Sequence, residues 1–207
     1  MAFKTAEYRT LDVINENKKE IMIWQIVGGI VIFGLGALWH FIFEWTNGWA
    51  PIGWILPVNE SVWEHVKLMY WPALIFYVIE GIFLYKKTNN FIFAKFVGFY
   101  GIPIMSISIF YVVYGAFGFE SFIFDTIVLG ILIGIQQFVS YKLLTREPVA
   151  GEKYNVLMIV SIVFIAILGI LLIVFTYVTP HIPFFEHVFS EQTGEYGILD
   201  HYGDHDH

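Results

Sequence analysis

Five long runs of mainly apolar residues follow one another along the chain, at residues 21–45, 61–85, 91–117, 121–144 and 154–178. About 20 apolar residues in a helix, at roughly 1.5 Å per residue, cross the hydrocarbon core of a bilayer. A backbone in lipid must satisfy its own hydrogen bonds, and no segment alternates with the period of two that marks a barrel strand. The pattern predicts an all-α fold, a polytopic membrane helix bundle with five transmembrane helices.

The runs divide the chain into three parts. Residues 1–20 have mixed charge and lack the apolar stretch of a signal peptide, so we expect a cytoplasmic N-terminal arm. Residues 21–178 form the five-helix transmembrane domain, and residues 179–207 form an acidic, histidine-containing extracytoplasmic tail. Gly130 and Gly134 in the fourth run fit a close helix contact of the kind that would support a homodimer.

Lysine and arginine indicate the orientation. Of the 11 basic residues, all except Lys67 lie before the first run or beside the second and fourth connections. The positive-inside rule therefore places the N-terminus in the cytoplasm and the C-terminus outside. We expect a multi-pass protein of the cytoplasmic (inner) membrane.

The composition excludes several classes of protein. Apolar residues make up 57% of the chain and charged residues only 14%, against roughly 25% charged in soluble domains, which excludes a soluble globular enzyme. The chain has no cysteine, so disulfides and thiolate metal sites are excluded as well. A net charge of −7 without a basic patch argues against a nucleic-acid partner.

Ionisable residues from separate segments fall at one depth, near the predicted extracytoplasmic surface. Such residues are costly within a membrane span, so their gathering indicates a function. Glu44 lies one helical turn from His40, and His181 lies just beyond the fifth run. On the inner side, Glu80 stands nearly alone. At about 1.5 Å per residue, the side chains roughly 6–8 Å below the outer helix ends are those of His40, Glu64, His65 and Asp125.

A divalent cation would compensate the charge of these carboxylates and bind their neighbouring imidazoles. Zn²⁺ suits such ligands best, with iron or manganese as alternatives. The expected ligands are His40, Glu44, His65 and His181.

Catalytic roles would fall to the remaining polar residues of the layer. Glu64 or Asp125 would act as general base, and Ser61 would steady a developing oxyanion. A purely structural interpretation stays open, because carboxylates near helix ends often reach the headgroup layer. In that interpretation Glu60 is a favourable charge at a helix N-terminus and Asn59 its cap.

The connection between the first two runs is uncharged from Glu44 to Glu60 and contains Trp45, Trp49 and Trp54. Tryptophan is typical of the membrane interface, which alone would explain these residues. Their position beside the polar layer also favours a site for a membrane lipid or another amphiphile. The tail would either gather cations through its acidic and histidine residues or simply be solvated.

The block from Leu38 to Pro72 resembles a family of small prokaryotic integral membrane proteins that has no assigned function. The similarity rests on His40-x-x-x-Glu44 and on the motif Asn-Glu-Ser-x-Trp-Glu-His at residues 59–65, and it extends loosely over all five spans. A fainter resemblance is to membrane hydrolases related to alkaline ceramidases. Ser61-x-x-x-His65 matches the first element of their zinc site and Asp125 would stand for the second, whereas the late His-x-x-x-His and two of seven spans are missing.

Four functions remain open. The first is a metal-dependent hydrolase of a lipid or amphiphile at the outer leaflet. The second is a cation or proton transporter, although Ser108, Gln136 and Gln137 are the few polar candidates for a pathway through the inner half. The third is a haem or quinone electron-transfer subunit that uses His40 and His65. The fourth is a subunit whose polar layer only packs against a partner.

Overall fold

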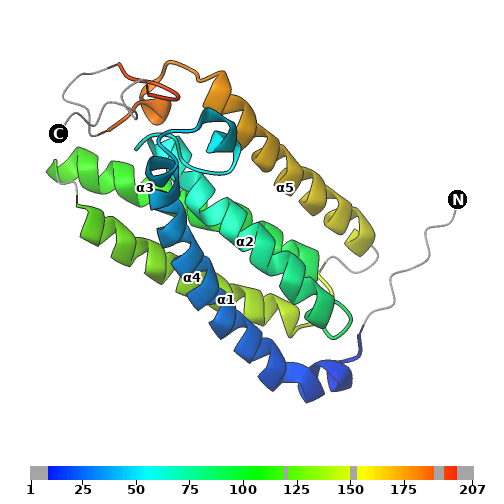
Figure 1. Ribbon diagram of the computed structural model, residues 1–207. Helices are drawn as coiled ribbons and strands as arrows, with labels where there is room; N and C mark the ends of the chain where they lie inside the picture. Colours follow the sequence, from blue (N-terminus) through cyan, green and yellow to red (C-terminus); the bar gives the residue numbers. More distant parts are fainter. Residues whose placement is uncertain (1–8, 119–120, 150–152, 189–193, 200–207) are drawn as a thin grey trace, which may run out of the picture. The chain divides into compact units, whose positions relative to one another are not determined.

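The computed structural model describes residues 9–118, 121–149, 153–188 and 194–199. These residues are helical and contain no β-strand, apart from an isolated bridge between Glu186 and Tyr196. Figure 1 shows the elements in chain order. The long helices are α1 (Leu11–Trp45), α2 (Val62–Leu84), α3 (Phe91–Phe117), α4 (Phe122–Leu144) and α5 (Tyr154–Tyr177), and the short 3₁₀ turns are η1 (Ala50–Trp54) and η3 (Pro183–Phe185).

All five predicted spans are helices that are long and apolar enough to cross a membrane, which confirms the fold class. The bounds of α2 to α5 differ from the predicted ones by one residue at most. Large apolar side chains are exposed on every helix, for example Ile30 (69%), Ile82 (76%) and Ile123 (71%). Lipid, rather than water, suits such a surface. The protein is therefore a multi-pass membrane protein.

The first helix begins ten residues before the predicted span, inside the predicted N-terminal arm. The cause is an amphipathic first part: Ile14 and Ile21 are fully buried, while the charged residues between them lie outside. A spacing of seven residues puts both isoleucines on one face of the helix. They pack in an apolar cluster with Leu84, Phe91 and Leu144.

The chain forms two compact units. The first unit consists of Met1–Ile32 and Ala73–Ala166, and the second consists of Phe33–Pro72 and Ile167–His207. Helices α1, α2 and α5 contribute residues to both units. The two units are described separately below.

In the first unit, Asn90 joins the connection between α2 and α3 to the end of α4. Its backbone is left-handed, with φ of 57°, a conformation that asparagine adopts more readily than most residues. Its side-chain amide donates to the carbonyls of Leu143 (2.9 Å) and Glu147 (3.0 Å) and accepts from the backbone N–H of Val149 (2.7 Å). These bonds satisfy backbone groups that the end of a helix leaves unpaired.

In the second unit, the connection between α1 and α2 folds over an apolar cluster of Phe43, Leu56 and Val58. Trp63 adds a second aromatic cluster with Phe175 and Phe185. Ser61 directly precedes α2, and its Oγ accepts a hydrogen bond from the backbone N–H of Glu64 (3.2 Å). This is the N-cap geometry that starts a helix, and it determines which residues of α2 reach the end of the unit.

Candidate metal centre

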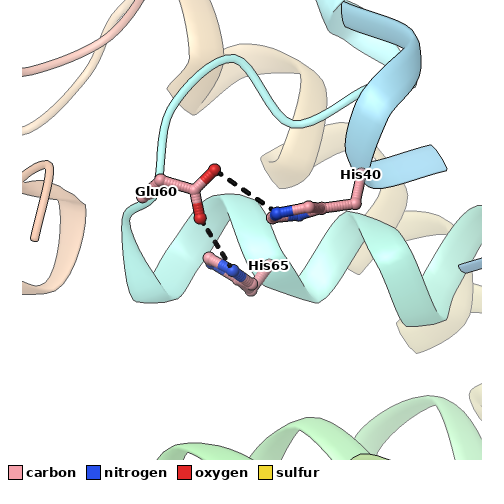
Figure 2. A group of neighbouring side chains, drawn as sticks. All are labelled: His40, Glu60 and His65. Carbon is pink, nitrogen blue, oxygen red and sulfur yellow. Dashed lines mark ion pairs between the residues drawn. The ribbon is translucent and has the colours of Figure 1, made fainter. Parts of the chain in front are cut away.

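Three side chains of the second unit meet at the ends of α1 and α2 (Figure 2). His40 comes from α1, Glu60 from the connection, and His65 from the start of α2. The Nε2 atom of His40 lies 3.7 Å from Glu60 Oε1, and the Nε2 atom of His65 lies 3.3 Å from Glu60 Oε2. Among the described residues, this is a group whose ligand atoms all lie within 4.8 Å of one another.

These separations are close to those of a metal site. In a tetrahedral zinc site with bonds of about 2.0–2.2 Å, the ligand atoms lie about 3.3–3.6 Å apart. The two distances, each to a different oxygen of Glu60, are near this range. The ligand atoms of the group lie within 4.8 Å of one another, and binding an ion would bring them closer. Two imidazoles and one carboxylate would leave a fourth position open, as in catalytic rather than structural zinc sites.

A second hydrogen bond determines which nitrogen of His65 faces Glu60. His65 Nδ1 lies 2.8 Å from the backbone carbonyl oxygen of Ser61, and a carbonyl oxygen can only accept, so Nδ1 carries a proton and donates it. In the neutral ring, Nε2 then presents its lone pair to the Glu60 carboxylate. Two electron-rich atoms at this distance require a proton or a metal ion between them. The same Nδ1–carbonyl bond orients metal-bound histidines in general.

The backbone of Glu60 is fixed by the C-terminal segment of the same unit. Its N–H donates to Nδ1 of His187 (3.0 Å), and the side chain of the preceding Asn59 donates to the carbonyl of Gly197 (2.7 Å). Burial raises the pKa of the Glu60 carboxyl. When the nearby imidazoles are protonated, the hydrogen bond from His65 and the charges of His65, His40 and His187 outweigh burial and hold that pKa below its usual value. The site thus favours the ionised carboxylate, which is the form that binds a metal.

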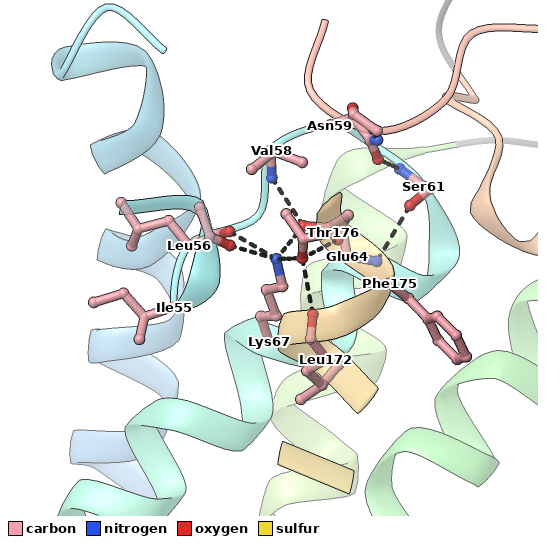
Figure 3. Close-up of polar contacts among 12 residues, drawn as sticks. Ile55, Leu56, Val58, Asn59, Ser61, Glu64, Lys67, Leu172, Phe175 and Thr176 are labelled. Carbon is pink, nitrogen blue, oxygen red and sulfur yellow. Dashed lines mark hydrogen bonds and ion pairs between the residues drawn. The ribbon is translucent and has the colours of Figure 1, made fainter. Parts of the chain in front are cut away.

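A buried lysine holds the connection that carries Glu60 (Figure 3). Lys67 Nζ is fully buried and donates to the carbonyls of Gly53 (2.7 Å) and Leu56 (3.1 Å). It also contacts Glu64 Oε2 (2.6 Å) and Thr176 Oγ1 (2.5 Å). An ammonium has three protons, so four oxygen partners satisfy it completely. The connection, α2 and α5 are therefore tied together within the unit.

Two of the four predicted metal ligands, His40 and His65, belong to the group of three. Glu44 is an exposed residue one turn further along α1, and the exposed ring of His181 stacks on Tyr196, with 4.6 Å between the ring centroids. The carboxylate of the group is that of Glu60. In the sequence, Glu60 has the pattern of a charge at a helix N-terminus, and only the fold of the connection turns it toward the histidines.

The three predicted catalytic residues have other surroundings. Ser61 caps α2, and Glu64 accepts from Lys67, from Thr176 and from the backbone N–H of Val58 (3.0 Å). These donors already occupy the Glu64 carboxylate. Asp125 is exposed in the first turn of α4 and belongs to the first unit. Their catalytic roles stay predictions. The cation-gathering role of the tail also stays a prediction, because His201, His205 and His207 lie outside the described residues.

The inner side differs from the sequence-based expectation, because Glu80 is not alone. Its carboxylate forms an ion pair with Lys95 (2.7 Å) and accepts from the side-chain amide of Gln25 (2.6 Å). In the sequence, Lys95 has the pattern of a basic residue that flanks a connection, yet it lies buried within α3. Gln25, Glu80 and Lys95 come from three different helices, so a spacing of residues along one helix could not have predicted their contacts.

The chain belongs to a family of unknown function, DUF6512, whose model matches residues 13–198. Comparison with the curated proteins and with the solved structures finds no significant match. The match confirms membership of an uncharacterised family, and the resemblance to ceramidase-related hydrolases stays a prediction. Residues 13–198 include the three residues of the candidate metal centre and the buried lysine beside them.

Proposed function

We propose that this member of a family of unknown function is a metal-dependent membrane hydrolase, with a divalent metal ion bound by His40, Glu60 and His65. The observation that carries the proposal is the meeting of a Glu60 carboxylate oxygen with one ring nitrogen each of His40 and His65, all within 4.8 Å of one another, while Nδ1 of His65 donates to the carbonyl of Ser61. Zn²⁺ is the first expectation, and the same ligands also suit Fe²⁺ or Mn²⁺. The metal ion would lower the pKa of a water bound at its open position to about 7.

Glu44 is the proposed proton acceptor of the reaction. It lies four residues from His40, on the same face of α1, and it is exposed rather than held by a buried cation. Glu64, by contrast, is fully engaged with Lys67 and with Val58. The charge of Glu44 acts on His40, which places Glu44 near enough to the proposed ligands to take a proton from a water beside them.

The proposed substrate is a membrane lipid or another amphiphile with an ester or amide bond near its headgroup. Trp45 (67% exposed), Trp49 (60%) and Trp54 (46%) lie between the metal ligands His40 and Glu60 in the chain. Exposed tryptophans favour the boundary between headgroups and acyl chains. A site in this layer would meet amphiphiles by lateral diffusion from the membrane.

The first test is the metal content of the purified protein. The protein is stripped with a chelator, reloaded with Zn²⁺, freed of excess metal and measured by elemental analysis beside His65→Ala and Glu60→Ala. His181→Ala is the matched control, because this histidine lies outside the group of three. We expect one metal ion fewer per chain in the first two variants and no loss in the control. Full metal content in both ligand variants would refute the ligand assignment.

The second test concerns hydrolysis. Wild-type protein in mixed micelles is assayed with fluorogenic esters and amides of increasing chain length, in parallel with Glu44→Gln. We expect Glu44→Gln to keep its metal and to lose about 10²–10⁴-fold in turnover, the usual contribution of a general base. Turnover that survives removal of the metal by the chelator would contradict a metal-dependent hydrolase.

A further inference from the structure

The first unit contains a second group of polar side chains, buried about one helical turn or more from the ends of their helices. Gln25 of α1, Glu80 of α2, Lys95 of α3 and Gln137 of α4 are each at most 5% exposed. Glu80 accepts from Gln25 (2.6 Å) and pairs with Lys95 (2.7 Å), and Lys95 donates to Ser140 of α4 (3.1 Å). Four membrane helices thus bring polar groups together, at a cost that calls for a function.

This group has polar atoms without partners. Among the described residues, Gln25 Oε1, Gln137 Oε1 and Gln137 Nε2 have no hydrogen-bond partner, and Glu80 Oε2 has only its ion pair. Leaving such atoms bare in an apolar interior is unfavourable, and in proteins ordered water usually satisfies them. The free atoms include both acceptors and a donor, which is the combination that suits water.

The two glutamine amides lie along one stretch of α1. A Cβ placed on Gly28 would lie only 2.9 Å from Gln137 Nε2, so glycine at this position leaves room for the amide of Gln137. Gly28 is three residues after Gln25, on the same face of the helix. The unpartnered amide of Gln137 therefore lies within about one helical turn of Gln25, which bonds Glu80.

Among the described residues, the two buried lysines differ in a way that bears on function. Lys67 has four oxygen partners and no spare proton. Lys95 has Glu80 and Ser140 as its oxygen partners, and its Nζ also lies over the rings of Tyr77 (4.4 Å) and Phe91 (5.0 Å). Ring faces attract an ammonium, so Lys95 keeps favourable contacts when Glu80 releases it.

We propose that Gln25, Glu80, Lys95 and Gln137 form an intramembrane site that binds water and that takes up and releases a proton at Glu80. On uptake, a proton from the acidified solvent, relayed by bound water that is itself left unchanged, joins a carboxylate oxygen of Glu80. The ion pair with Lys95 then breaks, and the ammonium stays over the two rings. On release, the proton returns to water and the pair re-forms. The titratable groups that face Glu80 are Lys95 of α3 and Tyr77 of α2, while α1 and α4 offer the neutral Gln25, Gln137 and Ser140.

The site is independent of the proposed metal centre, because all of its residues belong to the first unit and those of the metal centre belong to the second. It would give the chain the proton-binding carboxyl that a proton-coupled activity needs. Measurements in the His65→Ala background, with a chelator present, would therefore test it without regard to metal binding or hydrolysis.

The experiment is pH-difference infrared spectroscopy of the full chain reconstituted in lipid. We expect acidification to produce the C=O band of a buried carboxylic acid, shifted in D₂O because water reaches it, and absent in Glu80→Gln. That variant leaves Lys95 without a counter-charge, so the neutral double variant Glu80→Gln/Lys95→Met is measured beside it. Glu20→Gln, which removes a half-exposed carboxylate paired with Lys87, is the matched control and keeps the band.

Two outcomes would overturn the proposal. One is a wild-type spectrum in which no buried carboxyl band appears over the pH range that the protein tolerates. The other is a band that persists in the double variant, which would assign the proton to another carboxyl. In the first case the pair of Glu80 and Lys95 is a permanent contact between α2 and α3, and in the second the exchanging group lies elsewhere.

Discussion

The ammonium of Lys67 organises the second unit more than any other single group described above. It binds the carbonyls of Gly53 and Leu56, and the carboxylate that it neutralises, Glu64, in turn accepts from the backbone N–H of Val58. These contacts fix the connection between α1 and α2 at three points along its length. Glu60 follows two residues after Val58, so the lysine positions a proposed metal ligand that it does not touch.

Replacing Lys67 by methionine would leave the Glu64 carboxylate buried without its counter-charge. Removal of one partner of a buried ion pair costs about 3–5 kcal/mol, so we expect Lys67→Met to lower the free energy of unfolding by about that amount. The double variant Lys67→Met/Glu64→Gln removes both charges and should recover much of the loss. Unfolding in detergent, followed by tryptophan fluorescence, measures both. A single variant as stable as the double variant would show that the pair contributes little.

At this scale the sequence predicts some residues of the site better than others. His40 and His65 are identifiable, because a histidine within an apolar run is unusual and its depth follows from counting residues. The ion pair between Glu64 and Lys67 is also predictable from the sequence, since residues three apart lie on the same face of a helix. The role of Glu60 cannot be predicted in this way. Its direction depends on the bond of its own N–H to His187 and on the bond of the preceding Asn59 to Gly197, and both partners lie more than 120 residues away in the chain.

At the scale of elements, the meeting of His40 and His65 depends on how closely α1 approaches α2 within the second unit. A Cβ on Gly36 would lie 2.7 Å from the backbone carbonyl oxygen of Leu68. A backbone atom, unlike the end of a flexible side chain, cannot rotate away from such a clash. Gly36 is one turn before His40, and Leu68 is one turn after His65. The glycine therefore sets the distance between the helices beside the two histidines.

We expect Gly36→Ala to push the helices apart and to weaken metal binding by about 10–100-fold, the usual effect of disturbing the groups that orient a ligand. Gly34→Ala is the matched control, because nothing lies within 4 Å of a Cβ at Gly34. Alanine should even favour the helix there. Titration with Zn²⁺ against a competing chelator measures both affinities. Equal affinities in the two variants would contradict this role of Gly36.

The ends of the helices were predictable where apolar runs stop abruptly at polar or turn residues, as in α2 to α5. The start of α1 was not, because the segment from Leu11 to Glu20 carries charges on the face opposite Ile14. This segment contains no unbroken apolar run. One buried residue in every two turns is enough to hold it as a helix against its neighbours. Its helical period, with Ile14 and Ile21 seven residues apart, was the signal available.

At the scale of the whole molecule, the apolar surface on five helices indicates a membrane, and the basic residues predict a direction across it. The direction matters for function. A metal centre on the outer side would draw its metal and its substrate from outside the cell. Lys67, the one basic residue on the wrong side of the predicted topology, is buried against Glu64 and adds no exposed charge to that side. It is therefore no argument against the prediction.

The absence of cysteine from the chain makes the orientation directly measurable, since a single introduced thiol is the only one present. Ala50 in the first connection and Glu147 in the fourth are both exposed, and neither replacement removes a positive charge that could itself determine the topology. With a maleimide that does not cross membranes, we expect labelling of Ala50→Cys in intact cells. Glu147→Cys should react only after the cells are permeabilised. The reverse pattern would place the metal centre in the cytoplasm, and the search for its substrate would then move to the inner leaflet.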